Sequence, residues 1–225
     1  MPSAFVRARS RVVRAVASEI LPRSVFMAHG ARRSHPKRIA LTFDDGPDAM
    51  TPAYLETLGA LGVCATFFLI GEQALRSPEI VREYVRRGHD VGGHGWTHSP
   101  FSPMSPARLA DELDRTAAVL PPCRGRRPAV RPPRGVLSLP SLMRVARMGY
   151  LTVLWSVDSD DCRTRDPAVV ARRLAPSEVR SGDVVLLHEM QPWTLKALPS
   201  AVSALRRAGY EFVTIRELRG GRGGA

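Results

Sequence analysis

Short apolar runs alternate with amphipathic stretches along most of the chain. The runs are typical of buried strands, because each is short and is bounded by polar residues, Gly or Pro. They lie at Arg38–Phe43, Val63–Ile70, His89–Gly92, Ala129–Arg131, Tyr150–Val157, Asp183–Leu187 and Tyr210–Ile215. The stretches between them carry apolar residues at helical spacing, and they lie at Pro52–Leu61, Glu72–Arg87, Ser105–Leu120, Leu139–Met148, Pro167–Leu174 and Leu195–Ala208.

This alternation predicts a single α/β domain in which helices cover a parallel sheet that is open or closed into a barrel. A chain of 225 residues is long enough for one domain with a full core. No stretch is long enough to span a bilayer, and no secretory signal is recognisable. We therefore expect a cytoplasmic protein, although an extracytoplasmic location stays open.

The net charge of +12 is concentrated near the start of the chain. Residues 1–38 contain nine basic side chains and one acidic one, which gives 9 − 1 = +8. Apolar residues recur there at near-helical spacing, at Val6, Val13, Val16 and Ile20. Two interpretations stay open: a basic amphipathic helix on a membrane surface, or an arm that covers the base of the domain.

Two further features exclude other classes of protein. The three cysteines are odd in number and lack CxxC spacing, which predicts reduced thiols rather than a disulfide framework or a structural zinc cluster. The basic arm lacks a recognisable nucleic-acid-binding motif, and aromatic residues are only 6% of the chain. We therefore expect no specific nucleic-acid partner.

Two adjacent acids, Asp44 and Asp45, follow the first predicted strand within the segment TFDDGP. An ionised carboxylate is costly to bury unpaired, so acids at the end of a strand face a pocket more readily than a core. In the turn beyond the strand the two side chains can diverge, one toward a metal and one toward a water. The alternative is an ordinary Asp-Gly-Pro turn.

Two histidines, His94 and His98, follow the third predicted strand. Side chains four residues apart lie on one face of a helical turn, so the pair could bind one cation. With Asp45 as a third ligand, the set resembles the open coordination of catalytic zinc rather than a closed structural site.

Polar residues also follow three later strands. In the segment RPPRG at Arg131–Gly135, the prolines fix the backbone so that the N–H of Arg134 could serve as an oxyanion donor; the alternative is a surface loop. Asp161 and His188 follow the next two strands. Sites in parallel α/β folds gather at the carboxyl edge of the sheet, so we expect these groups to converge.

In this order, the segments resemble the motifs of the polysaccharide deacetylase family, the NodB-homology domain of carbohydrate esterase family 4. The resemblance covers residues 36–218 and implies a distorted (β/α) barrel; it leaves a basic arm at residues 1–35 and a Gly-rich tail at residues 219–225. TFDDGP is intact. The other motifs each depart at one position, with Gly95 for a hydroxyl residue, Arg134 for an aromatic, Cys162 for Trp and Glu189 for Asp.

The resemblance implies metal-dependent removal of N-acetyl groups from an amino-sugar polymer or glycolipid. The implied metal is zinc, with Co²⁺, Ni²⁺ or Mn²⁺ as alternatives. The implied metal ligands are Asp45, His94 and His98. The implied base is Asp44, which Arg131 orients, and the implied acid is His188, which Asp161 keeps protonated. The resemblance also implies that the backbone N–H of Arg134 binds the oxyanion and that Leu186 contacts the acetyl methyl group. An arginine at position 134 suits an anionic glycan. Hydrolysis of a non-glycan or formyl amide, and a non-catalytic glycan-binding role, remain alternatives.

Overall fold

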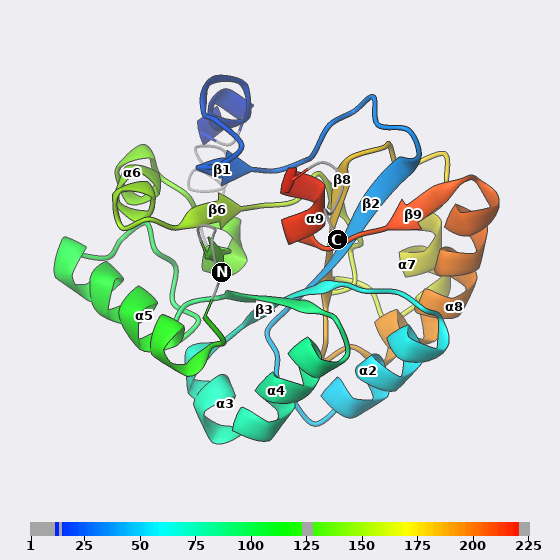
Figure 1. Ribbon diagram of the computed structural model, residues 1–225, viewed down its shortest axis with the longest axis horizontal. Helices are drawn as coiled ribbons and strands as arrows, with labels where there is room; N and C mark the ends of the chain where they lie inside the picture. The colour runs from blue at the N-terminus through cyan, green and yellow to red at the C-terminus, as the bar shows by residue number, and fades with distance from the viewer. Residues whose placement is uncertain (1–11, 14, 123–127, 221–225) are drawn as a thin grey trace.

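The computed structural model describes residues 12–13, 15–122 and 128–220, and a nine-stranded sheet forms its centre (Figure 1). The strands are β1 Phe26–Met27, β2 Lys37–Asp44, β3 Thr66–Leu69, β4 Asp90–Gly93, β5 Ala129–Val130, β6 Leu151–Val153, β7 Val157–Asp158, β8 Asp183–His188 and β9 Tyr210–Phe212. Their order is β1-β6-β5-β4-β3-β2-β8-β7, and β9 pairs with β2. All pairings of these strands are parallel, which confirms the predicted sheet.

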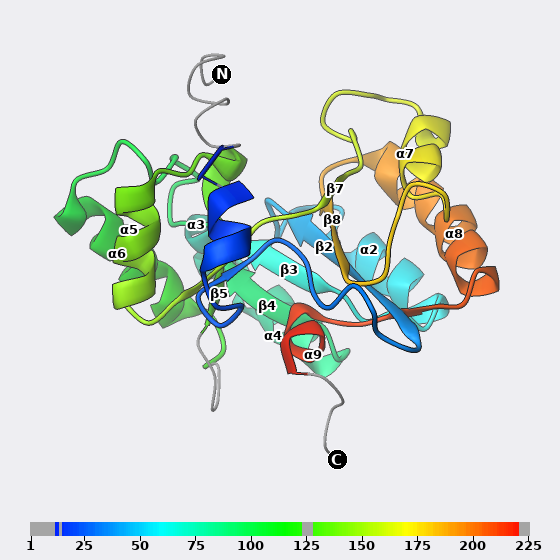
Figure 2. The same cartoon turned by 90° about the horizontal axis from the view of Figure 1, so that it is seen from above.

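Helices surround this sheet on the outside (Figures 1 and 2). They are α2 Thr51–Ala60, α3 Gly71–Arg76, α4 Pro78–Arg86, α5 Pro106–Val119, α6 Leu139–Arg147, α7 Pro167–Arg173 and α8 Pro192–Arg207. A further helix, α9 Ile215–Gly220, lies at one end of the barrel, and residues Pro133–Gly135 form a 3₁₀ turn. The largest apolar cluster lies between β2, β3, β8 and the helices α2, α4, α7 and α8. A second cluster, containing Ala40, Phe68 and Val184, packs on the other face of these strands.

The sheet curls until its two ends are joined by the chain itself (Figure 2). β6 pairs with the end strand β1, β7 is the last strand at the other end, and only residues 154–156 separate them. The N–H of Leu154 donates to Met27 of β1 at 2.8 Å, and the N–H of Ser156 donates to Val184 of β8 at 2.9 Å. Residues 154–156, here called the seam segment, thus close a distorted barrel of the predicted kind.

Three elements differ from the sequence-based expectation. The helix predicted over residues 72–87 is two helices, because Pro78 cannot continue α3 and instead starts α4. The strand predicted over residues 150–157 changes partners at the seam segment. The last predicted strand stops at Phe212, and α9 extends through residues 219 and 220, which were assigned to the tail.

The N-terminal arm contributes to the domain more than the sequence suggested. Phe26 and Met27 form β1 inside the predicted arm. Helical residues 15–20 precede it, and Ala17 packs in an apolar cluster with Phe26 and with Leu142 of α6. Val6, Arg7, Arg11 and Arg14 lie outside the described residues.

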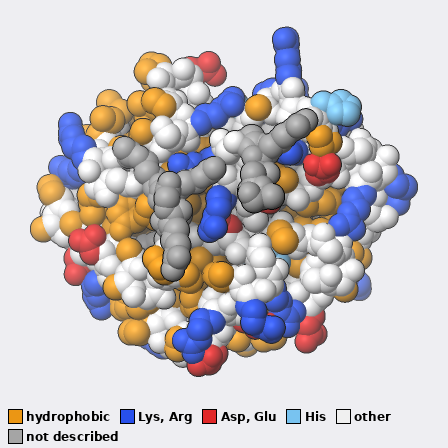
Figure 3. Space-filling model, viewed as in Figure 1, with side chains coloured by type: hydrophobic (Ala, Val, Ile, Leu, Met, Phe, Trp, Pro, Cys, Tyr) orange, Lys and Arg blue, Asp and Glu red, His pale blue; other side chains and the backbone are white. Residues whose placement is uncertain are grey.

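One end of the barrel is closed by α9, which lies toward the viewer in Figure 1. The N–H of Ile215 donates to Thr66 at the start of β3, and Arg216 pairs with Asp90 at the start of β4. Basic and acidic side chains are interspersed over this face (Figure 3). The carboxyl ends of the strands, opposite α9, carry the candidate site.

Candidate active site

The two acids of the first motif diverge as predicted. Asp44 is the last residue of the central strand β2, and its side chain is buried. Asp45 follows with φ at 72°, a left-handed conformation that Asp tolerates better than most residues. This turn directs the Asp45 carboxylate toward the loop after β4, while Asp44 remains in the sheet.

His94 and His98 lie in that loop, directly after β4. The prediction that they share a helical turn is wrong, because Gly95 and His98 have φ values of 78° and 60° and the loop is not helical. The two imidazole rings nevertheless lie side by side, with centroids 5.1 Å apart. The left-handed backbone conformation at these positions, rather than a helical turn, brings the two rings together.

Asp45, His94 and His98 converge on one point. Oδ1 of Asp45 is 3.1 Å from Nε2 of His98 and 3.5 Å from Nε2 of His94, and all three ligand atoms lie within 4.8 Å of one another. This Oδ1 is buried and has no partner in hydrogen-bonding geometry, which is costly unless a cation binds it. The nitrogen and oxygen donors suit a divalent cation, so the residues fit the metal that the resemblance implies.

The tautomer of His94 favours metal binding. Its Nδ1 donates to the backbone carbonyl of Arg131 at 2.8 Å, which leaves the lone pair of Nε2 for a cation. Burial lowers the pKa of His94 to about 3, so the ring is neutral at neutral pH. The nearby charge of Asp45 opposes this shift without reversing it.

A buried acid on α5 holds the histidine loop, and sequence reasoning missed it. Oε2 of Glu112 accepts from the N–H groups of Trp96 at 2.7 Å and Thr97 at 3.0 Å, and Oε1 accepts from the Thr97 hydroxyl at 2.7 Å. Glu112 occupies a buried position on the inner face of α5 between Leu109 and Leu113. An acid within an otherwise apolar helical stripe was the available signal.

Arg131 holds Asp44 from inside the barrel. Its guanidinium is fully buried and donates to Oδ1 of Asp44 at 2.7 Å. It also donates to the carbonyls of Val153 at 3.3 Å and Leu154 at 3.4 Å, and it lies over the ring of Phe68. Burial raises the pKa of Asp44, while the adjacent guanidinium opposes that increase. A partly raised pKa suits a general base.

Asp161 and His188 form the second polar pair. Nδ1 of His188 donates to Oδ1 of Asp161 at 2.8 Å, and Oδ2 accepts from the His188 N–H and from the hydroxyl of Thr194. Burial alone would lower the pKa of His188, but the hydrogen bond and charge of Asp161 outweigh it and raise this pKa well above 6.5. The contact with Asp161 therefore favours the protonated imidazole.

The base and acid candidates are neighbours. Asp44 and His188 are paired residues at the ends of β2 and β8, and each charge affects the pKa of the other. Leu186, which is predicted to contact the acetyl methyl group, is buried on β8. Arg134 is exposed, with φ and ψ of 59° and 12° in the 3₁₀ turn. The structure thus brings the first and last motifs together at one sheet edge.

A second buried acid, Glu189, lies beneath the loop after β2. It accepts from the hydroxyls of Tyr84 at 2.8 Å and Thr51 at 2.9 Å. Burial raises the pKa of Glu189 to about 8, and these two donors oppose that increase. The sequence showed only a replacement of Asp by Glu, which gave no sign of this supporting role.

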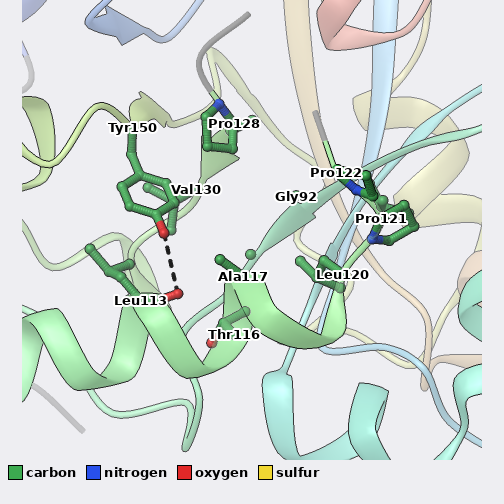
Figure 4. A pocket seen from close by; sticks show the side chains of 13 residues that line it. Gly92, Leu113, Thr116, Ala117, Leu120, Pro121, Pro122, Pro128, Val130 and Tyr150 are labelled. Atoms are coloured by element: carbon green, nitrogen blue, oxygen red, sulfur yellow. Dashed lines mark hydrogen bonds between the residues drawn. The ribbon is translucent and has the colours of Figure 1, made fainter. Parts of the chain in front are cut away.

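A cavity lies away from these groups, between α5 and strands β4 and β5 (Figure 4). Its lining is mostly apolar and includes Leu113, Leu120 and Val130, with the Tyr150 hydroxyl donating to the Leu113 carbonyl at 3.4 Å. None of the predicted site residues lines this cavity. The candidate site is therefore the sheet edge rather than this cavity.

The chain is similar to known deacetylases over most of its length. A family model described as polysaccharide deacetylase matches residues 31–153. The chain is 34% identical over 212 residues to the peptidoglycan-N-acetylglucosamine deacetylase PgdA of Listeria monocytogenes, which is 93% of this chain and 44% of that protein. It therefore spans less than half the length of that relative. It is 34% identical over 203 residues to the chitooligosaccharide deacetylase of a Bradyrhizobium species, which is 82% of this chain and 92% of that protein.

A solved structure shares the same fold. It is a carbohydrate esterase family 4 pseudoenzyme from Bacillus anthracis, with a TM-score of 0.79, 26% identity, and coverage of 89% of this chain and 70% of that chain. This similarity confirms the predicted barrel, but a fold shared with a pseudoenzyme leaves catalysis to be argued from the side chains. The family model matches more than half of the chain, and the chain belongs to the polysaccharide deacetylase family.

Proposed function

We propose that the protein is a metal-dependent hydrolase that removes N-acetyl groups from an amino-sugar polymer or glycolipid. The observation that carries this proposal is the pairing of Asp44 with His188 at neighbouring strand ends, in the same site as the Asp45–His94–His98 cluster. Amide hydrolysis needs a base for the attacking water and an acid for the leaving amine. The site offers a candidate for each role, because Asp44 can accept a proton and His188 can donate one.

In this proposal Asp45, His94 and His98 hold a divalent cation, which would polarise the acetyl carbonyl and acidify a water. Asp44 accepts the proton of the attacking water. Arg131 fixes the orientation of the Asp44 carboxylate through a charge-assisted hydrogen bond.

The remaining residues act on the leaving and acetyl groups. His188 donates a proton to the amine, which is too basic to depart as an anion, and Asp161 keeps His188 protonated beforehand. We assign the backbone N–H of Arg134 to the oxyanion and Leu186 to the acetyl methyl. Zinc is the proposed metal because two imidazoles and one carboxylate match catalytic zinc sites, with Co²⁺, Ni²⁺ and Mn²⁺ as alternatives.

The proposed substrate class is an N-acetylated glycan. Two relatives are named for deacetylation of peptidoglycan N-acetylglucosamine and of chitooligosaccharides, and both groups of substrate carry N-acetyl amino sugars.

The exposed side chain of Arg134 favours an anionic glycan. Substituting Arg134→Tyr should lower kcat/KM more for an anionic than for a neutral oligosaccharide. An equal effect on both would contradict this preference.

Acetate release from N-acetylglucosamine oligomers, with and without chelator, tests the main proposal. The wild type should release acetate only when metal is present, and Asp44→Asn should retain metal but lose about 10²–10⁴-fold in kcat. Full activity of Asp44→Asn would overturn the base assignment. Release of formate but not acetate would favour a formyl amide substrate, and glycan binding without turnover would favour the non-catalytic alternative.

We also propose that the N-terminal helix contacts a membrane surface. Val12, Val16 and Ile20 are 64%, 51% and 74% exposed, so an apolar stripe faces away from the domain. The sequence around it is rich in arginine, which suits anionic lipid. No helix among the described residues is long and apolar enough to cross a bilayer.

Vesicle sedimentation tests this contact. Deletion of residues 1–34 would remove β1 from the sheet, so substitution is the better test. The variant Val16→Glu/Ile20→Glu should bind phosphatidylglycerol vesicles more weakly than the wild type and keep its activity. Equal binding by both proteins would exclude the helix as the contact.

A further inference from the structure

A second group of potential metal ligands lies behind the proposed acid. Sγ of Cys162 is 3.2 Å from Nδ1 of His188, and the same nitrogen is 2.8 Å from Oδ1 of Asp161. Ligand atoms of these three residues all lie within 4.8 Å of one another. None of them belongs to the Asp45–His94–His98 cluster, so this is a separate group of sulfur, nitrogen and oxygen donors.

The geometry of this group needs little change to accept a cation. Ligand atoms around a tetrahedral zinc, with bonds of roughly 2.0–2.3 Å, are separated by about 3.4–3.6 Å. The Nδ1–Sγ separation is close to this value, and the Nδ1–Oδ1 separation must widen by about half an ångström. Oδ2 of Asp161 is already fixed by the hydroxyl of Thr194 and the N–H of His188, so Oδ1 is directed at the site.

Access and charge also favour binding here. Cys162 is exposed, so a hydrated cation can reach the sulfur from solvent. A thiolate and a carboxylate would supply two negative charges, and sulfur adds a preference for thiophilic ions that the Asp45 cluster lacks. A Trp at position 162 would supply no metal-binding atom.

We propose that Asp161, Cys162 and His188 bind a thiophilic divalent cation such as Zn²⁺ or Cd²⁺, and that this second ion inhibits the enzyme. Binding releases two protons to solvent, one from the Cys162 thiol and one from Nδ1 of His188. The imidazole is then neutral, with its remaining proton on Nε2, and is too weak an acid to protonate the leaving amine. The inhibition rests on the proposed function, whereas the binding does not.

Cadmium titration of the metal-free protein tests the binding. In a Cys64→Ser/Cys123→Ser background, where Cys162 is the remaining thiol, we expect two equivalents of Cd²⁺ and an ultraviolet sulfur-to-cadmium charge-transfer band. Adding Cys162→Ser or Cys162→Ala should leave one equivalent and abolish the band. A single equivalent without a band in the Cys162-containing protein would overturn the site, as would a band that persists without Cys162.

Acetate release at increasing Zn²⁺ tests the consequence. Cys162→Ser should need at least about tenfold more zinc for half-inhibition than the wild type, as expected when one ligand is lost. Cys64→Ser, which alters a thiol outside the group, should match the wild type. Equal inhibition of all three proteins would overturn the inhibitory role. If the wild type releases no acetate at all, the proposed function fails, and the cadmium titration still decides the site.

Discussion

At the scale of single residues, Glu112 supports the loop of the candidate metal site without belonging to that site. Its two carboxylate oxygens take three hydrogen bonds from the loop that carries the histidines. Partners of this kind orient metal ligands, and their loss typically weakens metal affinity about 10–100-fold. The position of His98 thus depends on a side chain of the following helix, α5.

Glu112→Ala should therefore weaken Zn²⁺ binding by about 10–100-fold, since the N–H groups of Trp96 and Thr97 lose their acceptor. The measurement is competition with a chromophoric chelator. Asp111→Ala is the matched control, because Asp111 is exposed and only pairs with Arg115. Equal affinities for the two variants would show that Glu112 does not support the loop.

The His188–Asp161 pair predicts the alkaline limb of the pH profile. In the proposed mechanism His188 must be protonated, so kcat should fall as pH rises through its raised pKa. Asp161→Asn removes the adjacent negative charge, so this limb should move to lower pH by about 1–3 units. The control is Asp160→Asn, whose carboxylate pairs with Arg163 and Arg173. If the alkaline limb of the kcat–pH profile does not move in Asp161→Asn, His188 is not the general acid.

Most residues of the site could be predicted from the sequence because they are polar groups at the ends of apolar runs. Asp44, His94 and His188 are candidates of this kind, and the structure brings them to one sheet edge. Glu112 and Glu189 were missed, because their contacts with the site loops arise from tertiary packing; an acid in the apolar stripe of α5 was the one signal for Glu112. The helical explanation for His94 and His98 failed for a related reason: left-handed backbone at His98 leaves no mark in hydrophobic periodicity.

At the scale of elements, the loop after β2 is fixed by a close contact with the end of β8. A Cβ added to Gly46 would lie 1.5 Å from Oε2 of Glu189, whose carboxyl is held by Tyr84 and Thr51. Only glycine leaves room for this carboxyl. The same loop carries Asp45, the proposed metal ligand, so the contact links packing to the proposed metal binding.

Gly46→Ala should destabilise the protein by about 1–3 kcal/mol and weaken metal binding, because Asp45 must move. Gly59→Ala in α2 is the control; no atom lies within 4 Å of its added Cβ, and the change should stabilise by about 0.5–1 kcal/mol. Urea denaturation measures the change in the free energy of unfolding of both variants. Glu189→Asp, which shortens the acid, should partly rescue Gly46→Ala; absence of any rescue would argue against this contact.

The elements themselves were predictable where periodicity was strong. Strand β2 and helices α5 and α8 appear near their predicted limits, because β2 is a continuous buried run and each helix buries one regular face. The two-residue strand β1 was not predictable, since pairing with β6 defines it rather than its own pattern. Helix α9 was missed because its main apolar anchor, Ile215, also extended the preceding strand-like run.

At the scale of the whole molecule, Glu189 links the free energy of unfolding to pH. Its pKa is about 8 when folded and 4.5 ordinarily, so the folded state binds the proton more tightly. Its contribution is therefore fully favourable below pH 4.5 and is lost as pH rises through 8. Between pH 4.5 and pH 8, the free energy of unfolding of the wild type should fall by about 3–5 kcal/mol more than that of Glu189→Gln.

Urea denaturation across this pH range measures the difference. Glu178→Gln, which alters an exposed acid, should follow the wild type. If the free energies of unfolding of the wild type and Glu189→Gln depend on pH in the same way, the Glu189 carboxyl is ionised in the folded state.

The seam segment has a consequence for heat inactivation. The guanidinium that orients Asp44 also binds the carbonyls of Val153 and Leu154, at the junction between the two ends of the sheet, where the N–H of Gly30 also donates to Gly182 at 2.7 Å. Thermal loosening of that junction would draw Arg131 away from the base before the surrounding helices separate. Turnover should consequently decline at temperatures where circular dichroism still reports an intact fold.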